Sequence, residues 1–281
     1  MKNDLEFINC PLCNSNHSSL WAIENEFHCV KCLNCELIYV NPRPSEKYIE
    51  QAVSAGTHLL KDGLEFSTKT RRLSSKISYY RKSVKAIFND FEKRECVNWL
   101  DVGAGYGEFV EALNKELPKN SIINGIEPML HKTIFAQKMG LPIKQGFITD
   151  LKETYDVVSL IDVFSHIPDF HNFLNDVKKN LNKRGEILIK TGNASEIGDR
   201  SEFPGPLNIP DHLVFGGQAQ LKEFLEGAGF SIISVQTEPI DDIWYTFKNT
   251  LKFILQKPVK LSFPFTSPTR TIWIRARLDL C

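Results

Sequence analysis

The stretch that decides the fold is Leu100–Leu113, which reads LDVGAGYGEFVEAL. An apolar run of strand length, residues 97–102, leads into it, and apolar side chains recur at helical spacing over residues 109–113. The turn between these two patterns contains three alternating glycines, Gly103, Gly105 and Gly107. Glycine permits positive φ and lets the backbone approach a ligand closely. A strand, a glycine turn and a helix in this order predict the first ligand crevice of an open α/β sheet.

The spacing of the glycines distinguishes between two classes of cofactor. Dinucleotide-binding folds use Gly-x-Gly-x-x-Gly, whereas the third glycine here comes one residue early. Asp101 lies two residues before the first glycine, where a pyrophosphate would need hydrogen-bond donors and positive potential. A carboxylate at this place suits a cationic ligand, so the pattern argues against a nicotinamide oxidoreductase.

Two later strand ends carry further polar residues. Ile122–Pro128 reads as the second strand of the unit and has an acid, Glu127, at its end. Such folds place there the carboxylate that accepts the ribose hydroxyls of a cofactor. Tyr155–Asp169 reads as an apolar strand that runs into Asp162-Val163-Phe164 and then into His-Ile-Pro-Asp. Because ligands bind at the carboxyl ends of strands in open α/β sheets, we expect both segments to face the cofactor.

The glycine turn with its acid and the His-Ile-Pro-Asp phrase together resemble the class I S-adenosylmethionine (SAM) dependent methyltransferases. SAM carries a sulfonium and an ammonium but no phosphate, which agrees with an acid beside the turn. The resemblance implies an α/β fold with a doubly wound, mostly parallel, seven-stranded Rossmann-like sheet. It also places Gly146 and Phe147 beside adenine, with a core position as the alternative for Phe147. The implied cofactor-binding residues are Asp101, Gly103, Ala104, Gly105, Gly107, Glu127, Pro128, Gly146, Phe147, Asp162, Val163 and Phe164.

The first 43 residues have the pattern of a zinc ribbon. Five of the seven cysteines fall between residues 10 and 35, in Cys-x-x-Cys knuckles, and two such knuckles indicate one Zn²⁺ site. Four thiolates make a closed, structural site. The strand that follows, Leu37–Pro42, resembles the ribbon ahead of many small-molecule and sugar methyltransferases, although Glu36 stands where glycine is usual. Cys29 could replace one of the second pair, and His17 or His28 could contribute. The preferred ligands are Cys10, Cys13, Cys32 and Cys35.

The segment between the ribbon and the glycine turn, residues 44–95, reads as helical with a break near residues 55–57. Its second half has an apolar stripe at a spacing of three or four residues and many basic side chains. The plain interpretation is a solvated helix face. The alternative is a lid over the active site that offers Tyr79 or Tyr80 and an arginine to an anionic substrate. Tyr80 is therefore a candidate catalytic residue.

Strands and helices alternate from residue 96 onward, which predicts a methyltransferase core over residues 96–281 behind the ribbon (1–43) and the helical segment (44–95). Thr271–Leu278 alternates as a final strand and is expected to run antiparallel. Asp241–Gln256 reads as an amphipathic helix, and we expect its apolar stripe to pack in the core. That stripe consists of Trp244, Phe247, Leu251 and Ile254.

Two histidines, His166 and His212, lie in loops at predicted carboxyl ends of strands. A hydroxyl that attacks a methyl group must lose its proton, which is general-base chemistry, and histidine suits it because its pKa is about 6.5. We expect His212 to be the base, oriented by Asp211 or Asp169, with His166 as the second candidate. Pro210–Phe215 resembles the acid-His-x-x-Phe phrase of zinc-ribbon sugar methyltransferases, with Asp211 where glutamate is usual. No role is expected for His17, His28, His58, His131 and His171.

The amino-acid composition limits the kinds of partner that the chain is expected to bind. The formal net charge is zero, which argues against a broad phosphate-binding surface and therefore against nucleic acid. No segment approaches the roughly 20 apolar residues that span a bilayer. Residues 1–6 lack the apolar core of a signal peptide. We therefore expect a cytoplasmic protein with reduced cysteines.

The resemblance points to a small-molecule acceptor. Ribbon-bearing sugar C-methyltransferases usually carry a long further carboxyl-terminal domain, for which residues 1–281 leave no room. We therefore expect the acceptor to be a hydroxyl of a sugar, a nucleotide sugar or a glycan precursor, by analogy within the fold. The alternatives are a sugar C-methyltransferase, an RNA methyltransferase that grips RNA with the ribbon, and a non-enzymatic zinc-ribbon interaction protein.

Overall fold

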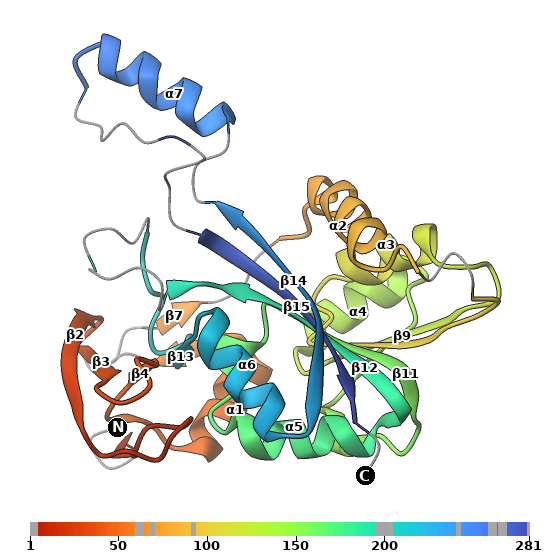
Figure 1. Cartoon of the computed structure of the whole chain (residues 1–281), viewed down its shortest axis with the longest axis horizontal. Coiled ribbons are helices and arrows are strands. Elements are labelled where there is room, and N and C mark those ends of the chain that lie inside the picture. The colour runs from red at the N-terminus through yellow and green to blue at the C-terminus, as the bar shows by residue number, and fades with distance from the viewer. Residues whose placement is uncertain are drawn as a thin grey trace.

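The computed structural model of the chain describes residues 5–59, 65–67, 71–90, 94–194, 200, 205–239, 243–257, 263 and 269–279. Its largest sheet has seven strands in the order β10-β9-β8-β11-β12-β15-β14 (Figure 1). The first five strands of that order are parallel, and β15 runs antiparallel to both of its neighbours. The predicted doubly wound, mostly parallel sheet with an antiparallel final strand is confirmed. The strands are β8 (Asn98–Val102), β9 (Ile122–Glu127), β10 (Ile143–Gln145), β11 (Tyr155–Ile161), β12 (Leu181–Gly192), β14 (Phe230–Pro239) and β15 (Thr269–Leu278).

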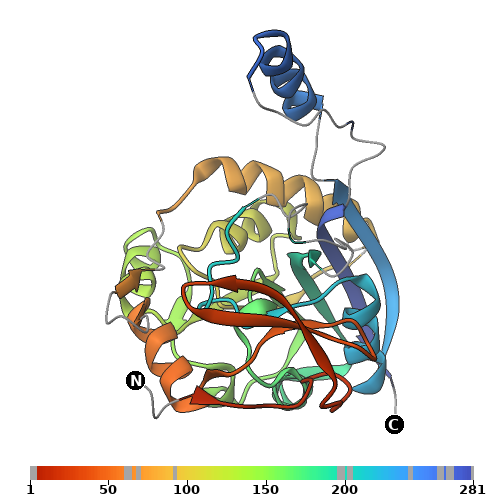
Figure 2. The same ribbon diagram turned by 90° about the vertical axis from the view of Figure 1, so that its left-hand side faces the viewer.

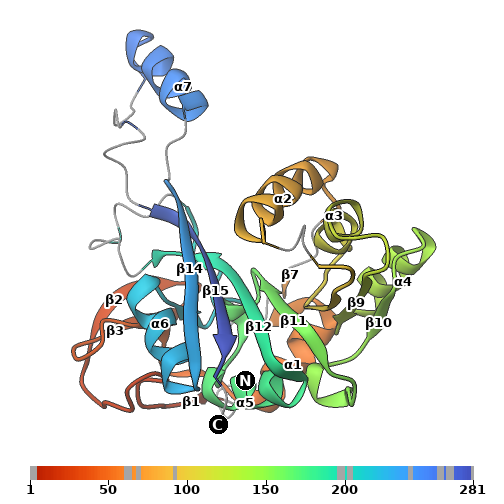
Figure 3. The same cartoon turned by 45° about the vertical axis from the view of Figure 1, so that its right-hand side comes forward.

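Successive side chains of the central strands point to opposite faces of the sheet and build two cores. Alternation with period two on strands that are apolar at every position is typical of a sheet buried on both faces. One core contains Trp99, Val157, Leu188 and Trp273. The other contains their neighbours Leu100, Val158, Ile189 and Ile274. Figures 1 and 3 show the first face covered by α2 (Ser74–Ile87), α3 (Glu108–Glu116) and α4 (Leu130–Lys138), and the second by α5 (Phe170–Lys179) and α6 (Gln218–Gly227).

The segment predicted to be helical between the ribbon and the core is interrupted by a hairpin. α1 (Glu46–Ala55) ends at Gly56, whose φ of 68° closes the helix in the left-handed conformation. The paired strands β6 (Thr57–Leu59) and β7 (Glu65–Ser67) follow, so the helical expectation is wrong for residues 57–59 and 65–67. Arg72, just before α2, and Arg81 of α2 pair with Glu111 and Glu116 of α3. The apolar stripe of α2 is buried, as predicted, and consists of Ile77, Tyr80, Val84 and Ile87.

The ribbon forms a second sheet, which the core completes. β2 (Ser18–Glu24), β3 (Phe27–Cys32) and β4 (Ile38–Val40) form an antiparallel meander, and β13 (Val214–Phe215) adds the fourth strand beside β4. The short β1 (Leu5–Glu6) pairs separately with β5 (Arg43–Pro44). Figure 2 shows the ribbon strands lying across the body of the molecule. Because β13 follows the Asp-His phrase directly, the ribbon and that loop belong to one structural unit.

The helix α7 (Ile243–Ile254), between β14 and β15, stands away from both sheets in all three views (Figures 1, 2 and 3). Its predicted apolar stripe is exposed, with Trp244 72% and Ile254 68% accessible, so the expectation that it packs in the core is wrong. Of the side chains described in α7, only Asn249 is buried. Within the described residues, no helix has both the length and the apolar character needed to cross a bilayer.

Candidate active site

The glycine turn has the backbone geometry that the sequence predicts, since all three glycines have positive φ. A Cβ on Gly103 would lie 2.6 Å from Val163 Cγ2, and one on Gly107 would collide with Leu141, so these two positions require glycine for packing. A Cβ on Gly105 would meet nothing within 4 Å. The middle glycine therefore borders open space, which is the geometry expected where backbone approaches a ligand.

Glu127 closes the turn from the neighbouring strand. Its Oε2 accepts the N–H of Gly105 at 2.7 Å, and its Oε1 accepts the N–H of Met129 at 3.0 Å. The Gly146 N–H donates to the Glu127 carbonyl at 3.2 Å and keeps the end of β10 beside the end of β9 and the adjoining Pro128. A carboxylate offers about four lone-pair positions, so each oxygen of Glu127 keeps an acceptor position for a ribose hydroxyl.

Asp101 is buried at the end of β8, next to a polar partner that the sequence analysis missed. Its Oδ1 accepts the Ser159 hydroxyl at 2.6 Å, and the Ser159 oxygen accepts the Trp99 indole N–H at 2.9 Å. Burial raises the pKa of Asp101 to about 7, reinforced by the charges of Glu127 and Glu108 and opposed by the Ser159 hydrogen bond. A cationic ligand near this carboxyl would favour its ionised form.

Two of the predicted cofactor residues are phenylalanines with opposite environments. Phe147 is 40% exposed after β10, so the alternative that its ring belongs to the core is wrong. Phe164, in the short helix η3 (Phe164–His166), is completely buried against Phe170 and Phe224, at ring-centroid distances of 4.8 and 5.9 Å. The predicted cofactor contact of Phe164 is therefore corrected: its ring belongs to the core, and only its backbone can face a ligand.

The last predicted cofactor segment begins at Asp162, directly after β11. Asp162 has φ 60°, and both of its carboxylate oxygens accept the Lys190 ammonium at 2.7 Å. Lys190 lies near the end of β12, so this ion pair ties together the carboxyl ends of two adjacent strands. The buried Ala104 donates its N–H to the Ile126 carbonyl at 3.0 Å and fixes the glycine turn to β9 in the same way.

The predicted catalytic loops meet and add a third histidine. The His166 Nδ1 atom lies 3.2 Å from Asp211 Oδ1, and the ring centroids of His166 and His212 are 4.7 Å apart. His58 Nε2 lies 3.1 Å from the same Asp211 oxygen. His58 is 1% exposed on β6, and its Nδ1 has no hydrogen-bond partner within the described part of the chain. His58, for which no role is expected from the sequence, is thus in contact with the predicted catalytic loop. Asp169, by contrast, caps α5 by accepting the Asn172 N–H.

Burial and hydrogen bonds determine which groups of the histidine–aspartate cluster are charged. For Asp211, burial acts to raise the pKa, but the hydrogen bonds from His166 and His58 outweigh it and lower that pKa. For His166, burial acts to lower the pKa, but Asp211 outweighs it and raises that pKa. Burial and the charge of His166 lower the pKa of His212 to about 4. His212 is therefore neutral at pH 7 and can accept a proton. The donor atoms of His166, Asp211 and His212 lie within 4.8 Å of one another, which could also hold a metal ion.

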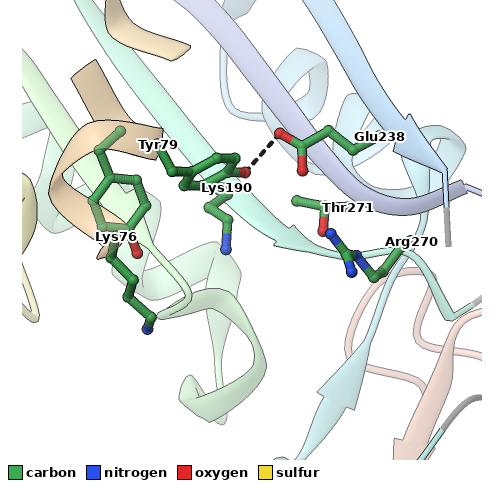
Figure 4. Close-up of a pocket in the computed structure, with 7 residues that line it drawn as sticks. Lys76, Tyr79, Lys190, Glu238, Arg270 and Thr271 are labelled. Atoms are coloured by element: carbon green, nitrogen blue, oxygen red, sulfur yellow. Dashed lines mark hydrogen bonds between the residues drawn. The ribbon is translucent and has the colours of Figure 1, made fainter. Parts of the chain in front are cut away.

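Tyr80 lies near Asp162 and Asp101, and it does not have the properties of a base. Its ring is 4% exposed and packs edge-on against Phe109 at 5.3 Å. Burial, followed by the charges of Asp162 and Asp101, raises its pKa, so its hydroxyl stays protonated. The predicted catalytic role of Tyr80 is thereby limited to that of a neutral donor in the wall of a pocket beside Lys190 (Figure 4).

The ribbon holds the histidine loop directly. The Leu213 carbonyl accepts the Val40 N–H at 2.9 Å, and the Leu213 N–H donates to the Ser165 carbonyl at 2.7 Å. The Gln220 amide of α6 donates to the Cys35 carbonyl at 2.7 Å. Backbone hydrogen bonds therefore tie Leu213, next to His212, to β4 of the ribbon and to Ser165, next to His166, while the Gln220 side chain ties α6 to the second cysteine knuckle.

The four predicted metal ligands gather in one cluster. Their sulfur atoms lie within 4.8 Å of one another, with Cys10 and Cys35 3.4 Å apart and Cys13 and Cys32 3.6 Å apart. Sulfur atoms around a tetrahedral Zn²⁺ are about 3.8 Å apart, whereas disulfide sulfurs are about 2.05 Å apart. The donor set therefore fits a structural metal. Cys29 lies in a different apolar cluster, so it does not replace Cys32 or Cys35.

A family model for a methyltransferase domain matches residues 62–235, which is more than half of the chain. The chain belongs to this methyltransferase family. Its core is a class I SAM-dependent methyltransferase domain, in agreement with the strand order and the glycine turn.

Curated relatives of the methyltransferase domain include the ubiquinone biosynthesis O-methyltransferases of Rickettsia prowazekii and Rickettsia typhi. They are 28% identical over 137 residues and 29% identical over 141 residues, which is 47% and 48% of this chain. The matches cover 53% and 56% of the relatives, so the chain spans about half the length of the curated relatives it matches.

Solved structures agree with the methyltransferase fold. The YcgJ protein of Bacillus subtilis has a TM-score of 0.51 and 15% identity, covering 71% of this chain and 99% of its own. The [4+2]-cyclase SpnF also has a TM-score of 0.51, with 13% identity and coverage of 72% and 82%. A fold that includes a protein named as a cyclase does not by itself fix the reaction. The reaction and the acceptor must therefore be argued from the site.

Proposed function

We propose that the chain transfers the methyl group of SAM to a hydroxyl of a small-molecule acceptor, with His212 as general base. The observation that carries the proposal is a buried, neutral histidine at a ring-centroid distance of 4.7 Å from the ion-paired His166, beside the end of β11. The curated relatives named as O-methyltransferases support an oxygen acceptor. The acceptor class, a sugar, nucleotide sugar or glycan precursor, is proposed from the resemblance of the ribbon and the Asp211-His212 phrase.

The residues of the cofactor side fit SAM by shape and charge. SAM supplies a methyl group on a sulfonium, which is already a good leaving group. Gly105 leaves space for the ligand, Glu127 keeps lone pairs for the ribose hydroxyls, and Asp101 provides negative potential near the cationic part. These groups hold the reactive end in place, so that the acceptor oxygen can approach to about 3 Å in line with the bond that breaks.

The residues of the acceptor side remove one proton. As the new oxygen–carbon bond forms and the carbon–sulfur bond breaks, the hydroxyl proton passes to His212. Asp211 cannot take this proton, because its hydrogen bonds to His166 and His58 keep its pKa low. It instead holds His166 through the carboxylate and fixes the loop on which His212 lies.

The cysteine cluster is proposed to hold a structural Zn²⁺. Four thiolates at tetrahedral spacing leave no open coordination position for catalysis. The metal would stabilise a ribbon that is too small to build its own core. Through the β4–β13 pairing it would also support the loop of the proposed base.

The proposal is tested by incubating the purified protein with methyl-labelled SAM and a panel of nucleotide sugars, then comparing His212→Gln with wild type. We expect labelled methyl ether with wild type and a rate about 10² to 10⁴-fold lower in the variant. SAM affinity should stay within about threefold, since His212 is not assigned to the cofactor. The matched control is His28→Gln, an exposed histidine of β3.

Two results would overturn parts of the proposal. A wild-type rate in His212→Gln would exclude His212 as the base. Loss of activity in a chelator too weak to strip the ribbon, with recovery on adding Mg²⁺, would reassign His166, Asp211 and His212 to a catalytic metal.

A further inference from the structure

A pocket of about 310 Å³ opens beside the Asp162–Lys190 ion pair, on the far side of β12 from the glycine turn. It is lined by residues of α2 and of the strand ends of β12, β14 and β15 (Figure 4). The lining residues are Lys76, Tyr79, Tyr80, Lys190, Glu238, Arg270 and Thr271. Acceptors in open α/β folds lie at the carboxyl ends of the strands, so this pocket is where an acceptor would extend from the methyl-transfer point.

The side chains that line this pocket carry more positive than negative charge. Lys190 is neutralised by Asp162 at 2.7 Å. Lys76 and Arg270 line the pocket from opposite sides and from exposed positions (Figure 4), and neither forms an ion pair with a residue that the structure describes. Two cations are therefore available to a ligand, one of them a guanidinium that can bind an oxyanion with two parallel hydrogen bonds.

The one acid of the lining, Glu238, is held by neutral donors. Its Oε1 accepts the Tyr79 hydroxyl at 2.6 Å and the Trp273 indole N–H at 3.1 Å. The carboxylate is thus directed toward the α2 wall, where it does not cancel both cations. Its second oxygen remains available to accept a hydroxyl of the same ligand.

We propose that this pocket binds an oxyanion carried by the acceptor, a phosphate or a carboxylate, through Lys76 and Arg270. The proposal rests on the function proposed above, in that it places the acceptor of methyl transfer in this pocket. It narrows the substrate class to an anionic small molecule with a hydroxyl near its charged group. Nucleoside-diphosphate sugars have this chemistry, and so do hydroxy acids.

The experiment measures anion binding without any methyl transfer. The full-length protein, saturated with S-adenosylhomocysteine, is titrated calorimetrically with pyrophosphate and separately with acetate. We expect pyrophosphate to bind, and Lys76→Gln and Arg270→Gln each to weaken it by about tenfold, as for one lost charged hydrogen bond. Lys85→Gln, on the same helix but outside the pocket, should bind like wild type.

Glu238→Gln should change pyrophosphate affinity in a direction that a purely structural role of Glu238 would not produce. The change removes a negative charge from the pocket and keeps an acceptor for Tyr79, so pyrophosphate affinity should increase by about threefold or more. Binding of pyrophosphate but not acetate would identify a phosphate site, and the reverse order would identify a carboxylate site. Absence of binding by both, or equal binding in the Lys76 and Arg270 variants, would overturn the proposal. Failure of SAM to bind would instead overturn the proposed function and leave the anion result standing.

A second inference rests on α7, which is independent of the pocket. Its exposed apolar residues recur at helical spacing along one side, and the lysines flank that side. Residues 243–257 contain three lysines and no acid. Of the side chains described in α7, the single buried one, Asn249, lies on the opposite side. The exposed apolar residues on this side are Ile243, Trp244, Phe247, Leu251, Ile254 and Leu255, whereas the exposed Phe253 lies on the other side.

This arrangement fits the surface of an anionic membrane. A helix with Trp, Phe and Leu on one face and lysines beside it lies in the lipid interface, with the apolar face in the acyl boundary. At 1.5 Å per residue α7 is about 18 Å long, too short to span the roughly 30 Å of hydrocarbon. We therefore infer that α7 docks on an anionic lipid surface.

Vesicle co-sedimentation of the full chain tests this inference. We expect binding to vesicles of phosphatidylglycerol and phosphatidylcholine, and little binding to phosphatidylcholine alone. Replacing Lys248 and Lys252 with glutamine should weaken binding by about fivefold per lysine, and Phe247→Ser with Leu251→Ser should abolish it. Leu33→Ser, an equally exposed leucine of the ribbon, is the matched control. No binding to anionic vesicles, or a dimer in solution that the Phe247 and Leu251 changes dissociate, would overturn it.

Discussion

The cofactor side and the acceptor side of the sheet edge are built in different ways. The cofactor side comes from two adjacent parallel strands and their turns, joined by the bond from the Gly105 N–H to Glu127. The acceptor side gathers His58 from a hairpin, His166 from the end of β11 and His212 from a loop held by the ribbon. The first side is a property of the core alone, whereas the second depends on the ribbon, for which a structural metal is proposed. Changes to the ribbon should therefore separate the two sides.

The largest effect is expected for Cys13→Ser. Loss of one thiolate should release the ribbon metal and free the β4–β13 pairing, because the ribbon has little core of its own. We expect methyl transfer to fall by about two orders of magnitude or more, as for loss of the base. The SAM dissociation constant should change by less than about threefold. Zinc content, calorimetric SAM binding and turnover measure the three quantities, with the exposed Cys96→Ser as control. Equal loss of SAM affinity would show that the two sides are not separable.

Gly105→Ala tests the cofactor side alone. Its φ of 56° makes alanine unfavourable by about 1 to 2 kcal/mol, and the new methyl would occupy the space left for the ligand. We expect SAM to bind more than about tenfold more weakly. Gly140→Ala is the matched control, because Gly140 also has positive φ and open space around its Cβ position but lies outside the site. Equal SAM affinities in the two variants would remove Gly105 from the cofactor contact.

The pH dependence of SAM binding reports on Asp101. Its pKa of about 7 means that the ionised form, which attracts the cationic ligand, becomes populated as pH rises through neutrality. SAM affinity should therefore increase between about pH 6 and 8, by up to tenfold per unit. The raised pKa also means that the folded state binds this proton more tightly than the unfolded state, so stability falls as pH rises from about 4 to 7. Asp101→Asn should flatten both profiles, and a profile unchanged by that substitution would exclude this group.

The smallest effect on SAM binding is expected at Phe147, and its comparison with Phe164 separates binding from packing. Phe147→Ala should weaken SAM binding by about three- to tenfold with little change in stability, because the ring is exposed and can stack on adenine. Phe164→Ala should cost about 3 to 5 kcal/mol of unfolding free energy through a core cavity. Chemical denaturation and calorimetry measure both. A destabilised Phe147 variant would place that ring in the core after all.

The sequence predicts the geometry of the glycine turn and of Glu127 well because that geometry is local. The acid, the glycines and Glu127 lie within one βαβ unit, where spacing along the chain determines position in space. Ser159 is the exception, yet a serine inside an otherwise apolar strand is itself a signal, since buried hydroxyls need partners. The four clustered cysteines can also be predicted from the sequence, because the Cys-x-x-Cys spacing of each knuckle fixes their geometry.

The acceptor side is less predictable because it depends on contacts between distant segments. No residue near His58 in the sequence distinguishes it from a histidine on the surface. Its position follows from a hairpin where a helix is predicted. The stripe of α7 has the periodicity of a core helix, and periodicity does not reveal whether a partner surface exists in the same chain. The pairing of β13 with β4 joins two strands too short to show any pattern.

The β4–β13 pairing also has a consequence for the order of folding. The ribbon strands are synthesised before the core, but their sheet lacks an edge strand until residue 215 has been made. Contacts between segments this distant in sequence slow folding, because a long loop must close before they form. Binding of the proposed metal by the nascent ribbon would order β4 before β13 is synthesised. β13 could then pair with a strand that is already formed. The availability of zinc during translation should then influence the yield of folded enzyme as well as its final stability.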